Sequence, residues 1–181
     1  MRKLSMEWDP CWKPDIAATL LFIVRGGRIL LIHKKRGIGA GKISGPGGKF
    51  EPGETARQCA LRELKEELGI EAAAPVERAR LHFSFACGTT PEIRCHVFLA
   101  RDFRGDPIET EEAEPVWFPA DAPPYERMWA DDPVWFPHFL AGERFEGFFR
   151  FRGEQLLEHE IVVLEQGEPW PLLSEFFDFT D

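Results

Sequence analysis

The carboxylates Glu63, Glu66 and Glu67 are spaced at positions i, i+3 and i+4, so that a helix would carry all three on one face. Like charges at this spacing repel one another, and the arrangement is unfavourable without a cation. With a divalent cation the same oxygens become hard ligands. Mg²⁺ is usually held by a few carboxylates together with substrate phosphates. The spacing therefore indicates chemistry on a phosphate-containing molecule.

A helix over Ala56–Leu68 is needed to present these carboxylates, and the local sequence favours one. The segment contains no Gly, Pro or β-branched residue. Thr55 and Gln58 fit a capping box at its start, and Gly69 is suited to end it in a left-handed conformation. Apolar side chains at helical spacing form a core-facing stripe: Ala60, Leu61, Leu64 and Leu68.

The plainer interpretation of this helix is an acidic surface in contact with water. Arg62 would then pair with Glu66 in the less favourable i,i+4 order, with little effect on stability. That interpretation does not account for Gly48 and Glu54, which stand at fixed distances upstream. The whole segment fits G-x5-E-x7-R-E-U-x-E-E-x-G-U, where U is a bulky aliphatic residue, and every fixed position is filled.

This pattern resembles the Nudix box, the signature of hydrolases that cleave a nucleoside diphosphate linked to another group. The resemblance implies that Glu63, Glu66 and Glu67 bind divalent cations and that a carboxylate orients or deprotonates water. It also implies that Arg62 holds a box carboxylate in place and that Gly48 offers its carbonyl oxygen to a metal ion. Mg²⁺ is the expected cofactor, with Mn²⁺ as an alternative. Metal-bound water of lowered pKa and bridged phosphate oxygens would supply most of the catalysis.

The resemblance extends beyond the box, from about Thr19 to Ile161. Over this length the chain is similar to the 8-oxo-dGTP diphosphatases of the MutT-homologue type within the Nudix family. The similarity rests on K-K-R-G-I-G-A-G from Lys34, G-P-G-G-K from Gly45, and W-A-D-D-P-V-W-F-P from Trp129. The last string is the most specific, because it belongs to a base pocket and not to the shared chemistry.

The resemblance places the base site at Trp129, Asp131 and Asp132. A purine can stack on the flat ring of Trp129, and such stacking is worth about 1–3 kcal/mol in nucleic-acid complexes. Two adjacent buried carboxyl groups raise one of their pKa values, so the pair would offer both a donor and an acceptor to an oxidised purine. The alternative is that the aspartates cap a helix with Pro133 in its first turn, while Trp129 belongs to the core.

Three further positions match substrate or metal contacts of the resembled enzymes. Lys34 would lie near the substrate phosphates, Phe83 would line the pocket, and Glu112 would reach the metal site from outside the box. Each also has a plainer interpretation. These are a solvated strand end for Lys34, a core aromatic for Phe83 and an acidic surface loop for Glu112.

Three positions depart from the pattern of the resembled enzymes. Ser44 stands where they have an Asn that hydrogen-bonds the base, and Ser is shorter with a single donor. Pro46 and Ile38 each replace an aromatic residue. We therefore expect a looser pocket, for which a preference for oxidised guanine does not follow from the sequence. The metal chemistry is unaffected.

Composition limits the classes of function that are expected. The chain has 181 residues, 44% of them hydrophobic and 16 of them Phe, which suits one domain with a sizeable core. Its net charge of −9 makes long DNA or RNA a poor partner, whereas a metal-bridged nucleotide is compatible. The four cysteines lack C-x-x-C spacing and are expected to be free thiols in a cytoplasmic protein. We expect a monomer with no signal peptide and no membrane partner.

The rest of the chain is predicted to be mostly strands. The expected strands are 16–24, 28–33, 78–86, 93–101, 116–118, 145–151 and 156–164, with a helix over 134–141. The dipeptide Gly26-Gly27 suits a two-residue hairpin turn. With the resemblance, this order predicts an α/β (α+β) fold, an α-β-α sandwich on a mixed sheet with one catalytic box helix. We expect a loose N-terminal arm over 1–15, a Nudix hydrolase domain over 16–164 and an acidic C-terminal tail over 165–181.

These features predict a Mg²⁺-dependent pyrophosphohydrolase. It would use water to convert a purine nucleoside triphosphate, 8-oxo-dGTP or a similar damaged purine, to the monophosphate and pyrophosphate, and so clean the nucleotide pool. A Nudix enzyme for a dinucleotide or a nucleotide sugar is the first alternative. The second is a nucleotide-binding module without turnover, against which the intact box argues.

Overall fold

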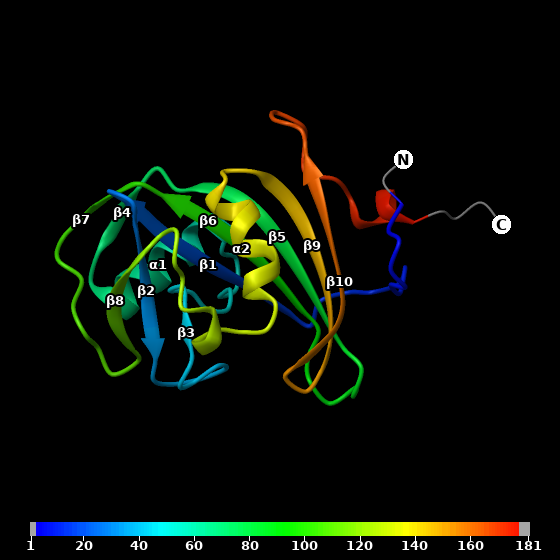
Figure 1. Cartoon of the computed structure of the whole chain (residues 1–181), viewed down its shortest axis with the longest axis horizontal. Coiled ribbons are helices and arrows are strands. Elements are labelled where there is room, and N and C mark those ends of the chain that lie inside the picture. Colours follow the sequence, from blue (N-terminus) through cyan, green and yellow to red (C-terminus); the bar gives the residue numbers. More distant parts are fainter. Residues whose placement is uncertain (1–2, 178–181) are drawn as a thin grey trace.

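The computed structural model describes residues 3–177, which form one large mixed β-sheet with a helix on each face (Figure 1). The predicted α+β sandwich is thereby confirmed. The elements in chain order are β1 (Ile16–Arg25), β2 (Arg28–Lys34), β3 (Ile43–Ser44), α1 (Ala56–Leu68), β4 (Glu71–Ala73), β5 (Val76–Phe85), β6 (Ile93–Ala100), β7 (Asp102–Arg104), β8 (Ala113–Pro119), η1 (Tyr125–Arg127), α2 (Asp132–Leu140), β9 (Arg144–Arg152), β10 (Gln155–Leu164) and η2 (Leu173–Phe176).

The large sheet has the strand order β10-β9-β5-β6-β1-β2-β3, and β8 pairs with β2. Two of its pairings are parallel, β1 with β6 and β5 with β9, and the others are antiparallel. Strands β4 and β7 form a separate two-stranded sheet. The hairpin between β1 and β2 turns through Gly26 and Gly27 with φ values of 58° and 72°, as the sequence predicted.

Each helix buries its apolar side against one face of the sheet, and in Figure 1 α2 lies in front of the sheet and α1 behind it. The cluster under α1 includes Leu21, Ile23, Leu64, Leu68 and Phe98. The cluster under α2 includes Phe22, Leu81, Trp135, Phe139 and Phe149. Because successive residues of β1 point to opposite faces, Leu21 and Phe22 belong to different clusters.

Helix α1 has the predicted bounds and the predicted ends. The Thr55 hydroxyl accepts from the backbone N–H of Gln58, and the Gln58 side chain accepts from the backbone N–H of Thr55. Gly69 closes the helix with φ 69°, in the left-handed region. Helix α2 begins two residues before its predicted start, at Asp132. The capped helix α1 therefore carries the box carboxylates at the predicted spacing.

The two end segments of the chain pack together on the sheet, beside β9 and β10 (Figure 1). Leu4, Trp8 and Trp12 are buried in one cluster with Phe148 and Phe176. The prediction of a loose arm over residues 1–15 is therefore wrong for its described part, because its aromatic side chains bury apolar area against the sheet. The expected tail is described as far as residue 177, and its last four residues lie outside the described part. The division into arm, domain and tail stays a prediction.

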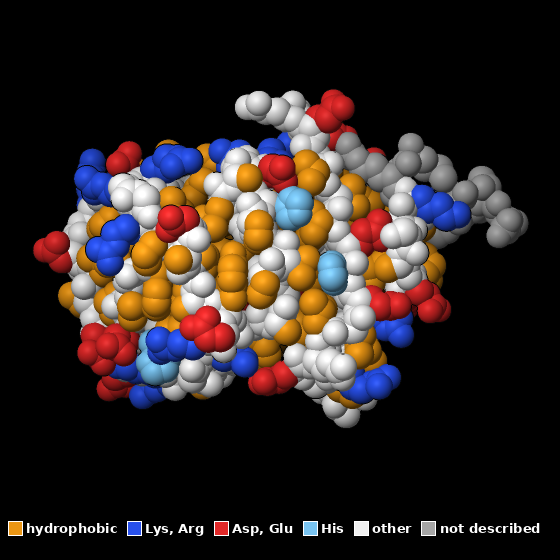
Figure 2. All heavy atoms as spheres, in the orientation of Figure 1, with side chains coloured by type: hydrophobic (Ala, Val, Ile, Leu, Met, Phe, Trp, Pro, Cys, Tyr) orange, Lys and Arg blue, Asp and Glu red, His pale blue; other side chains and the backbone are white. Residues whose placement is uncertain are grey.

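The surface over α2 carries both apolar and charged side chains. Figure 2 shows apolar side chains across the middle of this face and charged side chains mainly around its rim. Such a mixture is normal, since more than half of the accessible surface of a folded protein comes from apolar atoms. Neither helix in the described part of the chain is long and apolar enough to cross a membrane.

Candidate active site

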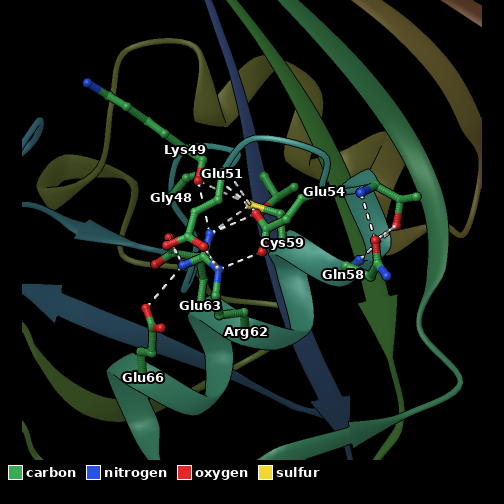
Figure 3. A network of polar contacts seen from close by, with 11 residues as sticks. Gly48, Lys49, Glu51, Glu54, Gln58, Cys59, Arg62, Glu63 and Glu66 are labelled. Carbon is green, nitrogen blue, oxygen red and sulfur yellow. Dashed lines mark hydrogen bonds and ion pairs between the residues drawn. The ribbon is translucent and has the colours of Figure 1, made fainter.

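Arg62 is the centre of the polar network at the start of α1 (Figure 3). Its Nε and Nη2 donate to the two carboxylate oxygens of Glu54, at 2.6 and 3.0 Å. Its Nη1 donates to Glu63 at 2.8 Å and to Glu66 at 3.1 Å. A fifth hydrogen bond joins Nη2 to the carbonyl oxygen of Lys49 at 3.1 Å. One planar guanidinium thus ties three box carboxylates to the preceding loop, a geometry for which Arg is suited.

The charges of this network are set by its contacts. The hydrogen bonds from Arg62 lower the pKa of Glu54 to about 2, and the bonds to Glu54 and Glu63 raise the pKa of Arg62. Partial burial raises the pKa of Glu63, although Arg62 opposes that shift. Arg62 and Glu54 are therefore ionised at neutral pH, and they form a charged pair that anchors the loop to the helix.

Glu67 has different surroundings from the other box carboxylates, because it is buried. Only 2% of the residue is exposed, and its carboxylate accepts from the backbone N–H of Gly47 at 2.9 Å. The ammonium of Lys34 lies 3.8 Å from it. Burial raises the pKa of Glu67 to about 7, and the charges of Glu63 and Glu112 add to this shift while Lys34 opposes it. The predicted positions Lys34 and Glu112 thus both lie within electrostatic range of Glu67.

The loop before α1 approaches the sheet so closely that it requires glycine. Gly48 O accepts from the N–H of Thr19 at 2.8 Å. A Cβ at Gly47 would lie 1.9 Å from Thr19 O, and a Cβ at Gly48 would lie 2.4 Å from the Glu63 carboxylate. At Gly47 the obstacle is fixed backbone and no side chain fits, whereas a side chain at Gly48 would displace the Glu63 carboxylate from its position. The glycines therefore let the loop backbone lie directly against the carboxylates of α1.

The donor set of this region fits a hard divalent cation, although the described residues do not form a converged cluster of three metal-ligating side chains. In the structure Glu63 and Glu66 are turned toward Arg62, and Glu67 toward Gly47. Mutual repulsion explains this arrangement, since each carboxylate takes a positive or N–H partner. All the available donors are carboxylate or carbonyl oxygens, which Mg²⁺ and Mn²⁺ accept. Ligation by these residues and by the Gly48 carbonyl stays a prediction.

A second group of carboxyls lies at the start of α2. Asp131 and Asp132 are 4% and 6% exposed. Asp131 accepts from Nε1 of Trp135 at 3.0 Å, and Asp132 accepts from the backbone N–H of Trp129 at 2.8 Å. Pro133 is in the first turn of α2, as the capping alternative required, but neither aspartate side chain makes the helix-capping hydrogen bond. Asp131 thus occupies the N-cap position that the alternative predicted, but its side chain does not cap the helix.

The surroundings of the two aspartates raise their pKa values. Burial raises the pKa of Asp131 to about 6. Burial, together with the charge of Asp131, raises the pKa of Asp132 well above its usual value. In the described part of the chain no Lys or Arg nitrogen lies within 4 Å of either carboxyl. Both shifts make the pair harder to ionise than ordinary aspartates.

Trp129 lies beside these aspartates and is half-buried. The ammonium of Lys42 stands over its ring, 4.7 Å from the centroid, and contacts Glu154 at 3.4 Å. A Cβ at Gly39 would lie 3.0 Å from the ring nitrogen. The loop between β2 and β3 therefore packs against the indole, and Trp129 is not part of the sealed core.

The other predicted pocket residues, and the two positions that depart from the pattern, differ in their burial and contacts. Phe83 is partly buried beside the α2 cluster and stacks on Phe149 at a centroid distance of 5.4 Å. Ser44 is in β3, paired with Ile32, and no hydrogen bond of its side chain is described. Ile38 is 55% exposed. Pro46 is buried, and its carbonyl accepts from Leu21.

Sequence reasoning missed three residues that the structure brings to these sites. Gly47 donates its N–H to Glu67, and the run Gly-Pro-Gly-Gly was the available signal. The hydroxyl of Thr110 donates to the carbonyl oxygen of Glu67 at 2.9 Å. Lys42 stands over Trp129. No local pattern identifies Thr110 or Lys42, because both act through contacts distant in sequence.

Comparison with known proteins agrees with this geometry. A family model described as the NUDIX domain matches residues 13–139. The oxidized purine nucleoside triphosphate hydrolase of Danio rerio is 43% identical over 81% of this chain and 94% of its own length. The enzyme of the same name from Mus musculus is 38% identical over 77% of this chain and 88% of its own. A crystal structure of a Mutator MutT protein from Bacillus halodurans matches with a TM-score of 0.73 and 26% identity, over 85% of this chain and 99% of that one.

The chain therefore belongs to the Nudix hydrolase family, and the resemblance seen in its sequence is confirmed. Within that family it is similar, over most of its length, to enzymes named for the hydrolysis of oxidised purine nucleoside triphosphates. Members of the family generally need a divalent metal ion. A small-molecule nucleotide is the class of substrate that this membership implies.

Proposed function

We propose that this protein is a Mg²⁺-dependent pyrophosphohydrolase, able to use Mn²⁺, that cleaves oxidised purine nucleoside triphosphates such as 8-oxo-dGTP. The products are the nucleoside monophosphate and pyrophosphate. The observation that carries the proposal is that two kinds of carboxyl site occur in one chain, the carboxylates bonded to Arg62 and the buried aspartate pair of raised pKa beside Trp129. The names of the two relatives support the choice of substrate.

In the proposed reaction, the box residues bind and orient. Glu63, Glu66 and Glu67, with the Gly48 carbonyl, would hold the metal ion, which lowers the pKa of a bound water and neutralises phosphate charge when bound. Arg62 would keep the carboxylates in position through its fork on Glu54. Lys34, already 3.8 Å from Glu67, would bind a substrate phosphate, and Glu112 would complete the acidic rim.

The base of the nucleotide would be recognised at the α2 end. Trp129 would stack on the purine, and Phe83 would form part of the pocket wall. A protonated aspartate can donate to a carbonyl oxygen or ring nitrogen, while its ionised neighbour accepts from an N–H. An oxidised purine differs from its parent in such groups. Asp131 and Asp132 would therefore provide the discrimination, with Ser44 adding a weaker or water-mediated contact.

The same proposal includes the oligomeric state, the compartment and the size of the substrate. We propose a monomer that acts on a small nucleotide in the cytoplasm and cleans the nucleotide pool. The net charge of −9 disfavours long nucleic acids as substrates. The triphosphate itself is compatible, because its charge would be bridged by the metal ion and by Lys34.

Product analysis with Mg²⁺ tests the proposal. The purified chain would be compared on 8-oxo-dGTP, dGTP, 2-hydroxy-dATP, ADP-ribose and a dinucleoside polyphosphate at equal concentration. We expect the highest kcat/KM for an oxidised purine triphosphate, with monophosphate and pyrophosphate as products. Preference for ADP-ribose or the dinucleotide would retain the hydrolase and reject this substrate. Absence of turnover on all five would favour the binding-module alternative.

A further inference from the structure

Glu92, the residue before β6, joins the N-terminal arm (residues 3–15) to the end of β5. Its carbonyl oxygen accepts from the backbone N–H groups of Asp15 and Ile16, at 2.9 and 3.0 Å. Its own N–H donates to the Asp15 carboxylate at 2.9 Å. One oxygen of its carboxylate accepts from the backbone N–H of Phe85 at 3.1 Å, and the other accepts from the indole N–H of Trp12. A single side chain thus ties the arm to β5.

Trp12 is the side chain of the arm that reaches Glu92, and it is fixed on several sides. It is 7% exposed. Its ring meets that of His82 edge to face at 5.4 Å, and the ring of Trp8 at 5.6 Å. The guanidinium of Arg94 lies 5.7 Å from its centroid. A buried indole N–H usually finds an acceptor, and here the acceptor is the Glu92 carboxylate.

The strand end that Glu92 holds carries the proposed wall of the base pocket. Phe83 stands opposite Ile93, the residue that follows Glu92. It packs on the α2 face of the sheet. Trp12 lies on the other face, because it contacts His82 and side chains alternate along β5. The arm therefore supports, from behind, the strand whose front forms the pocket wall.

The loop between β5 and β6 (residues 86–92) has few other attachments. Residues 86–89 are exposed. In the described part of the chain, the hydrogen bonds that tie this loop to other segments are those of Glu92 and one from the N–H of Ala86 to the carbonyl oxygen of Phe151, at 2.8 Å. A segment with exposed backbone and few bonds opens at low cost. Loss of a Glu92 bond should therefore be felt at the end of β5.

We propose that the N-terminal arm is a working part of the base site, in which Trp12 and Glu92 are positioning residues that fix Phe83 and so set the affinity for the purine. This inference rests on the proposed function, because Phe83 is a wall of the proposed pocket. Binding sites need wall residues that are locked by packing and by supporting hydrogen bonds. The box carboxylates are on α1 and have no contact with the arm, so affinity should change while the chemical step does not.

Trp12→Phe in the full chain tests the inference, since it keeps an aromatic ring in the cluster and removes the indole N–H. Steady-state kinetics with Mg²⁺ would be measured on 8-oxo-dGTP and dGTP. We expect KM for 8-oxo-dGTP to rise about three- to tenfold, the value of one hydrogen bond, with kcat unchanged. Amide hydrogen exchange at Phe85 should become faster, because its acceptor Glu92 is less firmly held.

The matched control is Trp8→Phe, the same substitution in the same cluster. Nε1 of Trp8 is buried and has no hydrogen-bond partner among the described residues. Its removal breaks no hydrogen bond, so KM and the exchange at Phe85 should stay as in the wild type. A purely structural effect of a smaller ring would appear in both variants, whereas the proposed link appears only with Trp12→Phe.

Glu92→Gln is the second variant, and it decides the matter where Trp12→Phe does not fold. An amide has one oxygen for the two donors that the carboxylate now accepts from. KM should rise again, and the double variant should show less than the product of the two single effects, because both break the same contact.

Two outcomes would overturn the inference, and they differ from each other. Equal KM values for Trp12→Phe and Trp8→Phe, or a loss confined to kcat, would reject the role of the arm and leave the proposed function in place. A wild-type protein without preference for an oxidised purine triphosphate would reject the proposed base pocket, and the role of the arm with it.

Discussion

The box and the base pocket both gather carboxyl groups, yet they treat the charge of those groups in opposite ways. In the box, Arg62 bonds to Glu54, Glu63 and Glu66, and its hydrogen bonds lower the pKa of Glu54 to about 2. In the pocket, Asp131 and Asp132 are nearly sealed from water without a cation in contact, and burial raises the pKa of both. Carboxylates that bind metal must be negative, whereas a carboxyl that reads a base gains by donating.

This difference shows how carboxyl groups can serve two functions in one chain. The deciding factors are the presence of a guanidinium and access to water, not the carboxyl group itself. Glu67 is intermediate, because it is buried like the aspartates but has Lys34 and the N–H of Gly47 as partners. Each of the following substitutions or changes of pH affects either the box or the base pocket.

The largest expected effect comes from Glu67→Gln or Glu63→Gln. Each variant removes a charged ligand while keeping size and hydrogen-bonding capacity, so kcat should fall by about 10²–10⁴. Steady-state kinetics with Mg²⁺ would measure the loss, and thermal unfolding would check that the fold is intact. Glu71→Gln, at an exposed glutamate of β4, is the matched control and should be neutral. Normal turnover by the Glu67→Gln variant would remove Glu67 from the proposed metal site.

The next effect is expected in the pocket, with Asp131→Asn and Asp132→Asn. An amide cannot change its protonation state, so each variant should lose selectivity for an oxidised purine over its parent by about ten- to a hundredfold in relative kcat/KM. The catalytic step itself should be retained on an unselected substrate. Asp121→Asn, at an exposed position, serves as the control. An unchanged ranking of substrates would contradict the base-pocket assignment.

The raised aspartate pKa values also predict a pH dependence of stability. The folded state holds a proton that the unfolded state, with an Asp pKa near 3.9, has lost. The free energy of unfolding should therefore fall as the pH rises from about 4 through the folded pKa of Asp131, which is about 6, and further for Asp132. Asp132→Asn should make this decline shallower, because the amide does not titrate. Urea unfolding of metal-free protein from pH 4.5 to 7.5 would measure it, and equal declines in both proteins would contradict the buried proton.

The smallest expected effect concerns Ser44. Asn at this position would restore the longer side chain with both a donor and an acceptor. Selectivity for 8-oxo-dGTP over dGTP should rise by about two- to tenfold, the value of one ordinary hydrogen bond. Ser44→Ala is the matched comparison and should give no gain. If Ser44→Asn also gives none, β3 does not reach the base in this chain.

Sequence reasoning succeeded where the information is local. The bounds of α1, its capping box and its glycine end depend on residues adjacent in sequence, and they were predicted correctly. The hairpin at Gly26 and Gly27 was predicted for the same reason. The box carboxylates were identified because one helix carries them. The sequence could not predict that Glu63 and Glu66 would bond to Arg62 while Glu67 bonds to Gly47, because this depends on how the loop before α1 packs against β1.

Features that depend on distant contacts were not predictable in this way. The parallel pairing of β5 with β9 joins segments more than sixty residues apart, and a single sequence carries no local signal for it. The position of Lys42 over Trp129 is likewise a tertiary contact. Burial of Trp8 and Trp12 required a partner surface from Phe148 and Phe176, and the segment alone looked like a polar arm.

The meeting of the two end segments has a consequence for engineering the chain. The N–H of Leu4 donates to the carbonyl oxygen of Phe176 at 3.3 Å, so the first and last parts of the fold are neighbours (Figure 1). Neighbouring ends are what circular permutation requires. A permutant with the two ends joined by a short linker, and opened at the exposed turn of Gly26 and Gly27, would keep every layer of the fold. New termini at this hairpin would lie away from the box loop, so a fused reporter would not obstruct it.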